Sequence, residues 1–146
     1  MTETKQAAGA RTVHLALVQF ESVLCDPAAN TQKACRMIAE AAAEGADLVV
    51  LPELFSTGYE LNIVGPHVPE LAEPVDGPTV RALQDAARAG NCYVVAGLAL
   101  TYDMAGVPFN SSVIIDRQGE LLGTYDKQHL WALERLSLIH ISEPTR

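Results

Sequence analysis

Apolar residues in this chain form short continuous runs that alternate with amphipathic segments. Three runs rich in β-forming residues predict strands covered on both faces: residues 13–20 (VHLALVQF), 47–51 (DLVVL) and 92–100 (CYVVAGLAL). Residues 113–116 and 120–125, joined by a turn at 116–119, predict an antiparallel hairpin. The expected order is therefore β-α-β-α-β followed by a hairpin.

Two helices are predicted between these strands. The first begins near Asp26 and Pro27, carries small and apolar residues at helical spacing, and ends at Gly45 in the left-handed conformation. The second begins around Pro78 and is stopped by Gly90. A helix between two adjacent strands predicts a parallel, right-handed β-α-β unit. The pattern therefore indicates an α/β fold with a mixed sheet and helices on one face, and an apolar opposite face that needs a separate cover.

The long segment at residues 61–75 interrupts this alternation. It contains three prolines and no sustained period, which predicts a loop without regular structure. The loop follows the second strand, so we expect it to lie at the carboxyl end of that strand and to shape an entrance to a site.

Glu53 follows the second predicted strand directly after Pro52. Ligands of open α/β sheets bind outside the carboxyl ends of strands, so a carboxylate in this position is a candidate for chemistry. The alternative is that Glu53 lies in the first turn of a short helix, where its charge complements the helix dipole.

Lys127 follows the last predicted strand closely. It reaches the Glu53 region if the two strand ends lie side by side. The alternative is a surface lysine that pairs with its neighbour Asp126, which is the common arrangement for a lysine in such a turn.

Composition narrows the class of protein. The chain has 146 residues, enough for one domain, and a net charge of -8 that argues against nucleic acid or an anionic membrane as a partner. Three cysteines without paired spacing (Cys25, Cys35 and Cys92) predict neither disulfides nor a metal site. No cofactor is expected, because a glycine-rich phosphate loop is also missing from the sequence. Residues 1–11 lack the apolar run of a signal peptide and are interpreted as a disordered tail of a cytoplasmic protein.

Several stretches, taken in order, resemble the nitrilase superfamily of carbon-nitrogen hydrolases. They are LPELFSTGY, DGPTV, AGLAL and FNSSVIIDRQGELLGTYDKQHLWALER, and the resemblance covers residues 12–135 as a partial domain. It implies an αββα sandwich of which this chain is the amino-terminal half. It also implies catalytic roles for Glu53 and Lys127 and a supporting role for Glu134. The complete protein is then expected to form a homo-oligomer and to act on a small amide, carbamoyl amine or nitrile.

The resemblance stops near Arg135. Residues 136–146 (LSLIHISEPTR) resemble a translated sequencing adapter and are interpreted as a non-native tail, the alternative being an unusual native terminus. Members of the family use a cysteine nucleophile farther along the chain than the lysine, and no cysteine here matches it. We therefore expect this chain to lack the third member of a Glu-Lys-Cys triad and to be inactive by itself.

Two other functions compete with the hydrolase hypothesis. The first is a non-catalytic module that binds a partner through the uncovered face of its sheet. The second is a Rossmann-like nucleotide-binding domain, which is disfavoured because the first β-α turn, ESVLCDPAAN, contains no glycine.

Overall fold

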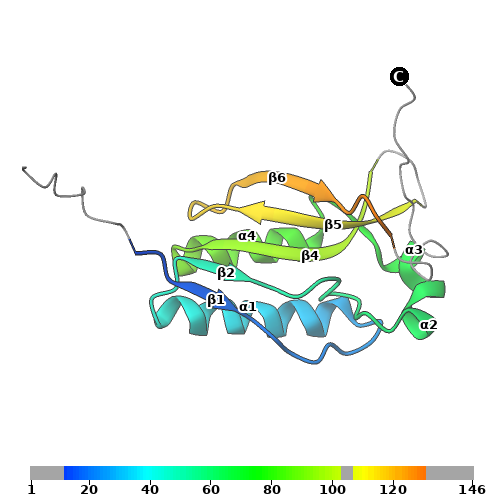
Figure 1. Cartoon of the computed structure of the whole chain (residues 1–146), viewed down its shortest axis with the longest axis horizontal. Coiled ribbons are helices and arrows are strands. Elements are labelled where there is room, and N and C mark those ends of the chain that lie inside the picture. The colour runs from blue at the N-terminus through cyan, green and yellow to red at the C-terminus, as the bar shows by residue number, and fades with distance from the viewer. Residues whose placement is uncertain (1–11, 103–106, 131–146) are drawn as a thin grey trace, which may run out of the picture.

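A strand-helix-strand unit opens the part of the chain that the structure describes. This structure is a computed structural model, and it describes residues 12–102 and 107–130. Strand β1 (Leu15–Leu17) pairs in parallel with β2 (Leu48–Val50), and helix α1 (Pro27–Ala43) connects them (Figure 1). The Asp26 carboxylate caps α1 by accepting a hydrogen bond from the backbone N–H of Ala29. Gly45 follows α1 with a φ of 87°, so the predicted bounds of this helix are confirmed.

The second long helix, α4 (Pro78–Gly90), ends at Gly90, as predicted. Gly90 is its last helical residue, and Asn91 is the residue that takes the left-handed conformation, with a φ of 49°. Gly90 also has a packing role, because a Cβ atom there would lie 2.8 Å from the Cβ of Ala42 on α1. Glycine at this position therefore lets the two long helices approach each other.

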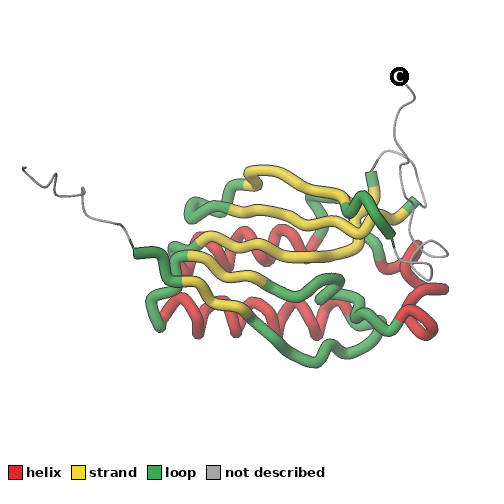
Figure 2. The backbone as a smooth tube through the Cα atoms, viewed as in Figure 1, coloured by secondary structure: helices red, strands yellow, loops and turns green. Residues whose placement is uncertain are grey.

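The sheet is mixed, as predicted. Its order is β1-β2-β4-β5-β6, in which β4 (Tyr93–Thr101) pairs in parallel with β2 and antiparallel with β5 (Pro108–Ile115). β5 and β6 (Leu121–Asp126) form the hairpin, and β5 begins five residues before the predicted strand at 113. Helices α1 and α4 lie on the same face of the sheet (Figure 2) and share one apolar core with it. This arrangement confirms the predicted α/β class with helices on one side.

The segment predicted as an irregular loop is folded into short elements, so that prediction was wrong. It forms α2 (Leu61–Val64), the 3-10 turn η1 (Gly65–His67), α3 (Val68–Leu71) and the two-residue strand β3 (Glu73–Pro74), which pairs with β4. Pro66 and Pro69 are the second residues of η1 and α3, where a missing N–H removes no helical hydrogen bond, and Pro74 is the last residue of β3. Leu61, Val64 and Val68 are buried against Leu54, and this small core holds the segment at the carboxyl end of β2.

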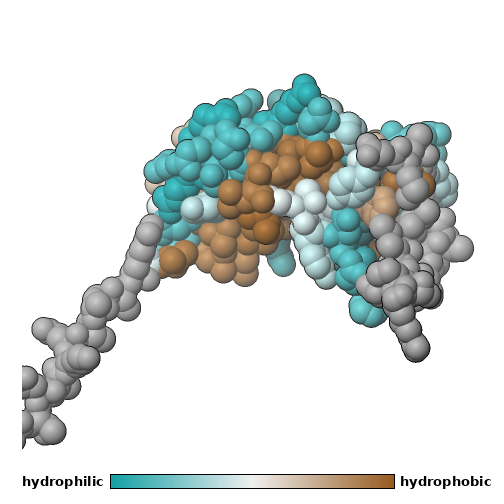
Figure 3. Space-filling model, turned by 90° about the horizontal axis from the view of Figure 1, so that it is seen from above, coloured by the Kyte–Doolittle hydropathy of each residue, from teal (hydrophilic) through white to brown (hydrophobic). Residues whose placement is uncertain are grey.

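The sheet face opposite the helices is open and apolar. The side chains of β1 are exposed there, Leu15 to 54% and Leu17 to 70%, so the prediction of a first strand covered on both faces was wrong for this chain. Six apolar residues on this face line a hollow of about 670 Å³, together with Asp47 and Arg117, and Figure 3 shows an apolar band across the molecule. The six apolar residues are Val13, Leu48, Tyr93, Val95, Ile114 and Leu122.

This open face predicts poor behaviour of the 146-residue chain expressed alone. Exposed apolar surface of this kind binds hydrophobic dyes and promotes association, so we expect dye fluorescence, aggregation and a broad thermal transition. A Leu122→Lys change should lower dye binding and aggregation. The matched control is Ile63→Lys, because Ile63 is about as exposed (54% against 59% for Leu122) but lies on α2. A monomer that melts sharply without binding dye would contradict this expectation.

Candidate functional site

Glu53 lies in a tight turn that directly follows β2. The turn rests on β4, because the N–H of Leu51 donates to the carbonyl of Val95 and the N–H of Phe55 donates to the carbonyl of Gly97. Between these two hydrogen bonds the chain bulges outward at Glu53. The next helix begins only at Leu61, so the alternative that placed Glu53 in the first turn of a short helix was wrong.

Two unusual backbone positions make this turn possible. Leu54 is buried with a φ of 48°, a left-handed conformation that non-glycine residues seldom adopt. Gly97 on β4 lies under the turn, and a Cβ atom there would be 2.8 Å from the Cα of Glu53. Sequence analysis missed Gly97, although a glycine inside an otherwise apolar strand is a known sign of close backbone approach.

Lys127 is held at the end of β6. Its N–H donates to the carbonyl of Asn110 on β5 at 2.8 Å. Its neighbour Asp126 accepts hydrogen bonds from the hydroxyl groups of Ser111, at 2.6 Å, and Tyr102, at 2.8 Å. These contacts hold the end of β6 against β5 and against Tyr102, which follows β4. The backbone position from which the Lys127 side chain extends is therefore well defined.

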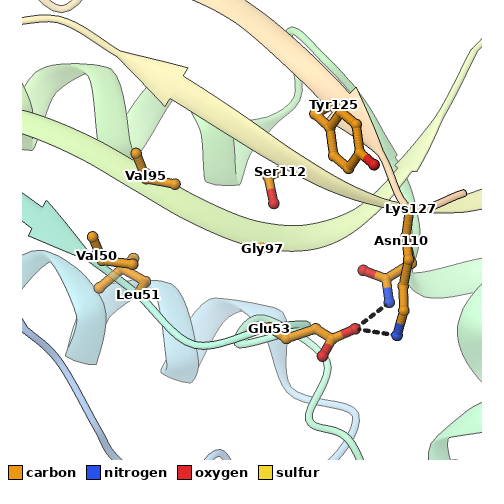
Figure 4. A pocket seen from close by; sticks show the side chains of 9 residues that line it. All are labelled: Val50, Leu51, Glu53, Val95, Gly97, Asn110, Ser112, Tyr125 and Lys127. Carbon is orange, nitrogen blue, oxygen red and sulfur yellow. Dashed lines mark hydrogen bonds and ion pairs between the residues drawn. The ribbon is translucent and has the colours of Figure 1, made fainter.

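The side chains of Glu53 and Lys127 meet. The Lys127 Nζ lies 2.9 Å from the Glu53 Oε1, although the two residues are 74 positions apart in the sequence. The same Oε1 accepts a hydrogen bond of 2.6 Å from the Nδ2 of Asn110 (Figure 4). The predicted proximity of the carboxylate and the ammonium group is therefore confirmed, whereas the contribution of Asn110 was missed. Its only sequence signal is a polar residue that begins the run NSS inside an otherwise apolar strand.

Strand register explains why these residues come together. Gly97 of β4 is opposite Ser112 of β5, which is opposite Tyr125 of β6. Side chains two positions apart on a strand share a face, so Asn110 and Lys127 belong to the same face as these three residues. Together with Val50, Leu51, Glu53 and Val95 they line a pocket of about 300 Å³. Val95 also lines the apolar hollow described above, so the pocket opens onto the uncovered face of the sheet.

The ion pair contributes little to stability. The side chains of Lys127 and Glu53 are 34% and 46% exposed. Exposed pairs of this kind typically stabilise a fold by about 0.2–1 kcal/mol. Stability alone therefore does not explain why a buried amide and a lysine both bind one carboxylate oxygen inside a pocket. This arrangement is typical of a site that performs chemistry.

The three cysteines lie outside this pocket. Cys92 is buried just before β4, at the far end of that strand from Glu53, as predicted. Burial raises the pKa of the Cys92 thiol, although the charge of Arg117 opposes the shift. Burial also raises the pKa of the Cys35 thiol on α1, and the charge of Asp85 adds to the shift. Thiols with raised pKa values are poor nucleophiles at neutral pH. The third cysteine, Cys25, packs against the small core around Leu54.

Some predicted residues lie outside the described part of the chain. Glu134 is one of them, and so is the whole segment at residues 136–146. Within residues 12–102 and 107–130, no group of three His, Cys, Asp or Glu side chains is arranged to hold a metal ion. In the same part of the chain, every helix is too short or too polar to cross a membrane.

Comparison with known proteins identifies relatives of the chain. A family model described as carbon-nitrogen hydrolase matches residues 14–145. A nitrilase from Pyrococcus abyssi is 40% identical over 124 residues, which are 84% of this chain and 46% of the relative. An omega-amidase from Homo sapiens is 33% identical over 122 residues, which are 82% of this chain and 41% of the relative. The chain thus spans less than half the length of these two relatives.

Solved structures of amidases also resemble this chain. An amidase from Nesterenkonia sp. superposes with a TM-score of 0.76 at 26% identity, over 90% of this chain and 49% of the amidase. A glutamate-to-glutamine mutant of the amidase from Nesterenkonia sp. AN1 superposes with a TM-score of 0.77 at 25% identity, over 91% of this chain and 51% of the mutant. In that mutant, acrylamide has added to the active-site cysteine.

Proposed function

The chain belongs to the nitrilase superfamily of carbon-nitrogen hydrolases, and from this premise we propose that it is the amino-terminal part of an enzyme that hydrolyses non-peptide carbon-nitrogen bonds. The substrates are small amides, carbamoyl amines or nitriles. Glu53 and Lys127 are two members of a Glu-Lys-Cys triad, and Glu134 helps to position the substrate and the lysine. The cysteine belongs to the part of the complete protein that is not contained in this chain, so the chain by itself is inactive.

One observation carries this proposal: the Glu53 carboxylate and the Lys127 ammonium group lie 2.9 Å apart in a pocket of about 300 Å³. Hydrolysis of an unactivated amide needs a nucleophile, a proton carrier and a group that stabilises the developing negative charge. A carboxylate is suited to carry the proton, and an ammonium group is suited to stabilise the charge. The pocket therefore contains two of the three required groups.

In the proposed mechanism, Glu53 first takes the proton of the cysteine thiol, and the thiolate attacks the substrate carbon. Lys127 stabilises the oxyanion of the tetrahedral intermediate. Glu53 then gives its proton to the leaving ammonia or amine, and a thioester remains on the cysteine. Finally, Glu53 takes a proton from water, and the hydroxide attacks the thioester. The C–S bond breaks, Glu53 gives that proton to the leaving thiolate, and the carboxylic acid and the free thiol are formed. With a nitrile, the first covalent product is a thioimidate.

The open apolar face favours a second candidate function. A chain that ends natively after Arg146 would leave this face exposed, and a non-catalytic module would use it to bind a partner. The encoding DNA distinguishes the two functions. A reading frame that continues past Arg135 into a strand bearing a cysteine supports the hydrolase, whereas a genuine stop codon after Arg146 supports the binding module.

The proposal is tested on the complete protein, obtained by sequencing the gene past Arg135. Ammonia release is measured with butyramide, an aliphatic nitrile and an N-carbamoyl amine as substrates. Mass spectrometry of the quenched reaction is used to find the acyl group on a cysteine. We expect ammonia release from at least one substrate and an acyl adduct on a cysteine beyond residue 135. If no ammonia is released from any of the three, or if turnover occurs without an adduct, the proposal is wrong.

A further inference from the structure

We propose that Asn110 is a positioning residue that fixes the orientation of the Glu53 carboxylate, so that Oε2 is the oxygen that carries the proton. This inference rests on the proposed function, because it assigns a role within the same reaction. It concerns a residue that does not itself exchange protons. The inference is based on the contacts of the Glu53 Oε1 atom.

Both donors in the pocket converge on the same oxygen of Glu53. The Nδ2 of Asn110 lies 2.6 Å from Oε1 and the Nζ of Lys127 lies 2.9 Å from Oε1, and Figure 4 shows both interactions ending on that atom. Among the described residues, none donates a hydrogen bond to Oε2. The two oxygens are thus unequal: Oε1 is occupied by two donors and Oε2 keeps its lone pairs for proton transfer.

A lysine alone does not create this difference. An ammonium group on a flexible chain of four methylene groups can follow either oxygen as the carboxylate rotates. Asn110 is 5% exposed and lies on β5, an inner strand between β4 and β6, where its backbone pairs with Ala99 of β4. A second donor on such a rigid strand removes the rotational freedom of the carboxylate.

Asn110 also contacts Lys127 directly. Its backbone carbonyl accepts the hydrogen bond from the N–H of Lys127 at 2.8 Å, so one residue holds the start of the lysine side chain and the carboxylate to which that side chain binds. Asparagine adds this second hydrogen bond without adding a charge. A neutral amide therefore orients the carboxylate without bringing a second cation into the pocket.

The proton transfer follows from this geometry. The thiol S–H bond breaks and an O–H bond forms at Oε2, while Oε1 keeps both of its hydrogen bonds. In the next step the proton leaves Oε2 for the nitrogen of the leaving amine. Because Oε1 keeps its two hydrogen bonds, Oε2 stays in one position. It accepts the thiol proton there and donates it to the leaving amine from the same place.

The test uses the complete protein with Asn110→Ala and Asn110→Asp. The control variant is Gln84→Ala, because the Nε2 of Gln84 donates to the carbonyl of Gly119 at 2.8 Å, in an amide hydrogen bond on α4 and outside the pocket. Turnover of the best amide, KM, the pH profile of kcat/KM and the melting temperature are measured for each protein.

For Asn110→Ala we expect kcat to fall by about 10- to 100-fold, the loss typical of one hydrogen bond to a charged group. KM should stay within about threefold, because the change acts on proton transfer rather than on binding of the ground state. For Asn110→Asp we expect the acid limb of the pH profile to move to higher pH, since two adjacent carboxylates hold a proton more tightly than one. Gln84→Ala should keep the wild-type kcat and pH profile.

Three results would overturn the proposal. The first is wild-type kcat and pH profile in both Asn110 variants, which leaves the proposed function intact if Glu53→Gln is still inactive. The second is a lower melting temperature together with an unshifted pH profile in Asn110→Asp, which assigns a purely structural role to Asn110. The third is a wild-type protein that releases no ammonia from any substrate, which overturns the proposed function as well.

Discussion

Replacing Glu53 by glutamine is expected to abolish turnover of the complete protein while leaving the fold intact. Glutamine has nearly the same shape, and its carbonyl oxygen can still accept the hydrogen bonds from Lys127 and Asn110. It cannot take or give the proton that every step of the proposed mechanism requires. General acid-base catalysis contributes about 10²- to 10⁴-fold per group. Because Glu53 acts in three successive steps, we expect a loss of kcat at the upper end of this range.

The stability of this variant should change little. The ion pair is partly exposed, and losing it costs about 0.2–1 kcal/mol, which corresponds to a decrease in melting temperature of up to about 4 °C for a protein of 150–250 residues. The matched control is Glu120→Gln, an exposed carboxylate next to β6 but at the opposite end from Lys127. Folded Glu53→Gln protein that keeps at least a tenth of wild-type kcat would remove Glu53 from the mechanism.

Replacing Lys127 by methionine is expected to cause the second large loss. Methionine keeps most of the length and flexibility of lysine but carries no charge. Loss of one group that stabilises an oxyanion typically lowers kcat by about 10²- to 10³-fold. The rate at which the acyl adduct forms should fall by a similar factor. It is measured by quenching the reaction at short times and weighing the protein by mass spectrometry.

Lys33→Met is the control for this experiment. Lys33 lies on α1, where its Nζ donates to the carbonyl of Glu21 and lies 5.0 Å from the centre of the Phe20 ring. It is outside the pocket, so its replacement tests the effect of losing a lysine charge and its packing elsewhere. If Lys127→Met forms and hydrolyses the acyl-enzyme at the wild-type rate, Lys127 has no part in charge stabilisation.

The pattern of apolar and polar residues was sufficient to predict the elements that depend on local sequence. The β-α-β unit, the cap at Asp26, the left-handed Gly45 and the turn of the hairpin all follow from nearest neighbours along the chain. The position of Glu53 at the end of β2 and that of Lys127 at the end of β6 follow in the same way. Local propensity is informative in these cases because each feature is formed within a few residues.

The sequence failed where packing outweighed local signals. Three prolines predicted an irregular loop at residues 61–75, yet apolar residues at spacings of three and four bury short helical turns against Leu54. Gly90 was predicted only to stop α4, yet its lack of a side chain also lets α1 and α4 approach each other, and Asn91 takes the left-handed position after the helix. In both cases the local pattern did not reveal a contact with a distant segment.

The sequence by itself thus determined the order of the elements and the placement of one carboxylate and one lysine at two strand ends. Only the tertiary structure decided that these ends meet, because the register of β4, β5 and β6 sets which side chains share a face. Pairing across strands also placed Gly97 under the Glu53 turn and the Asn110 amide on Oε1. Such contacts join residues tens of positions apart, and no short-range pattern encodes them.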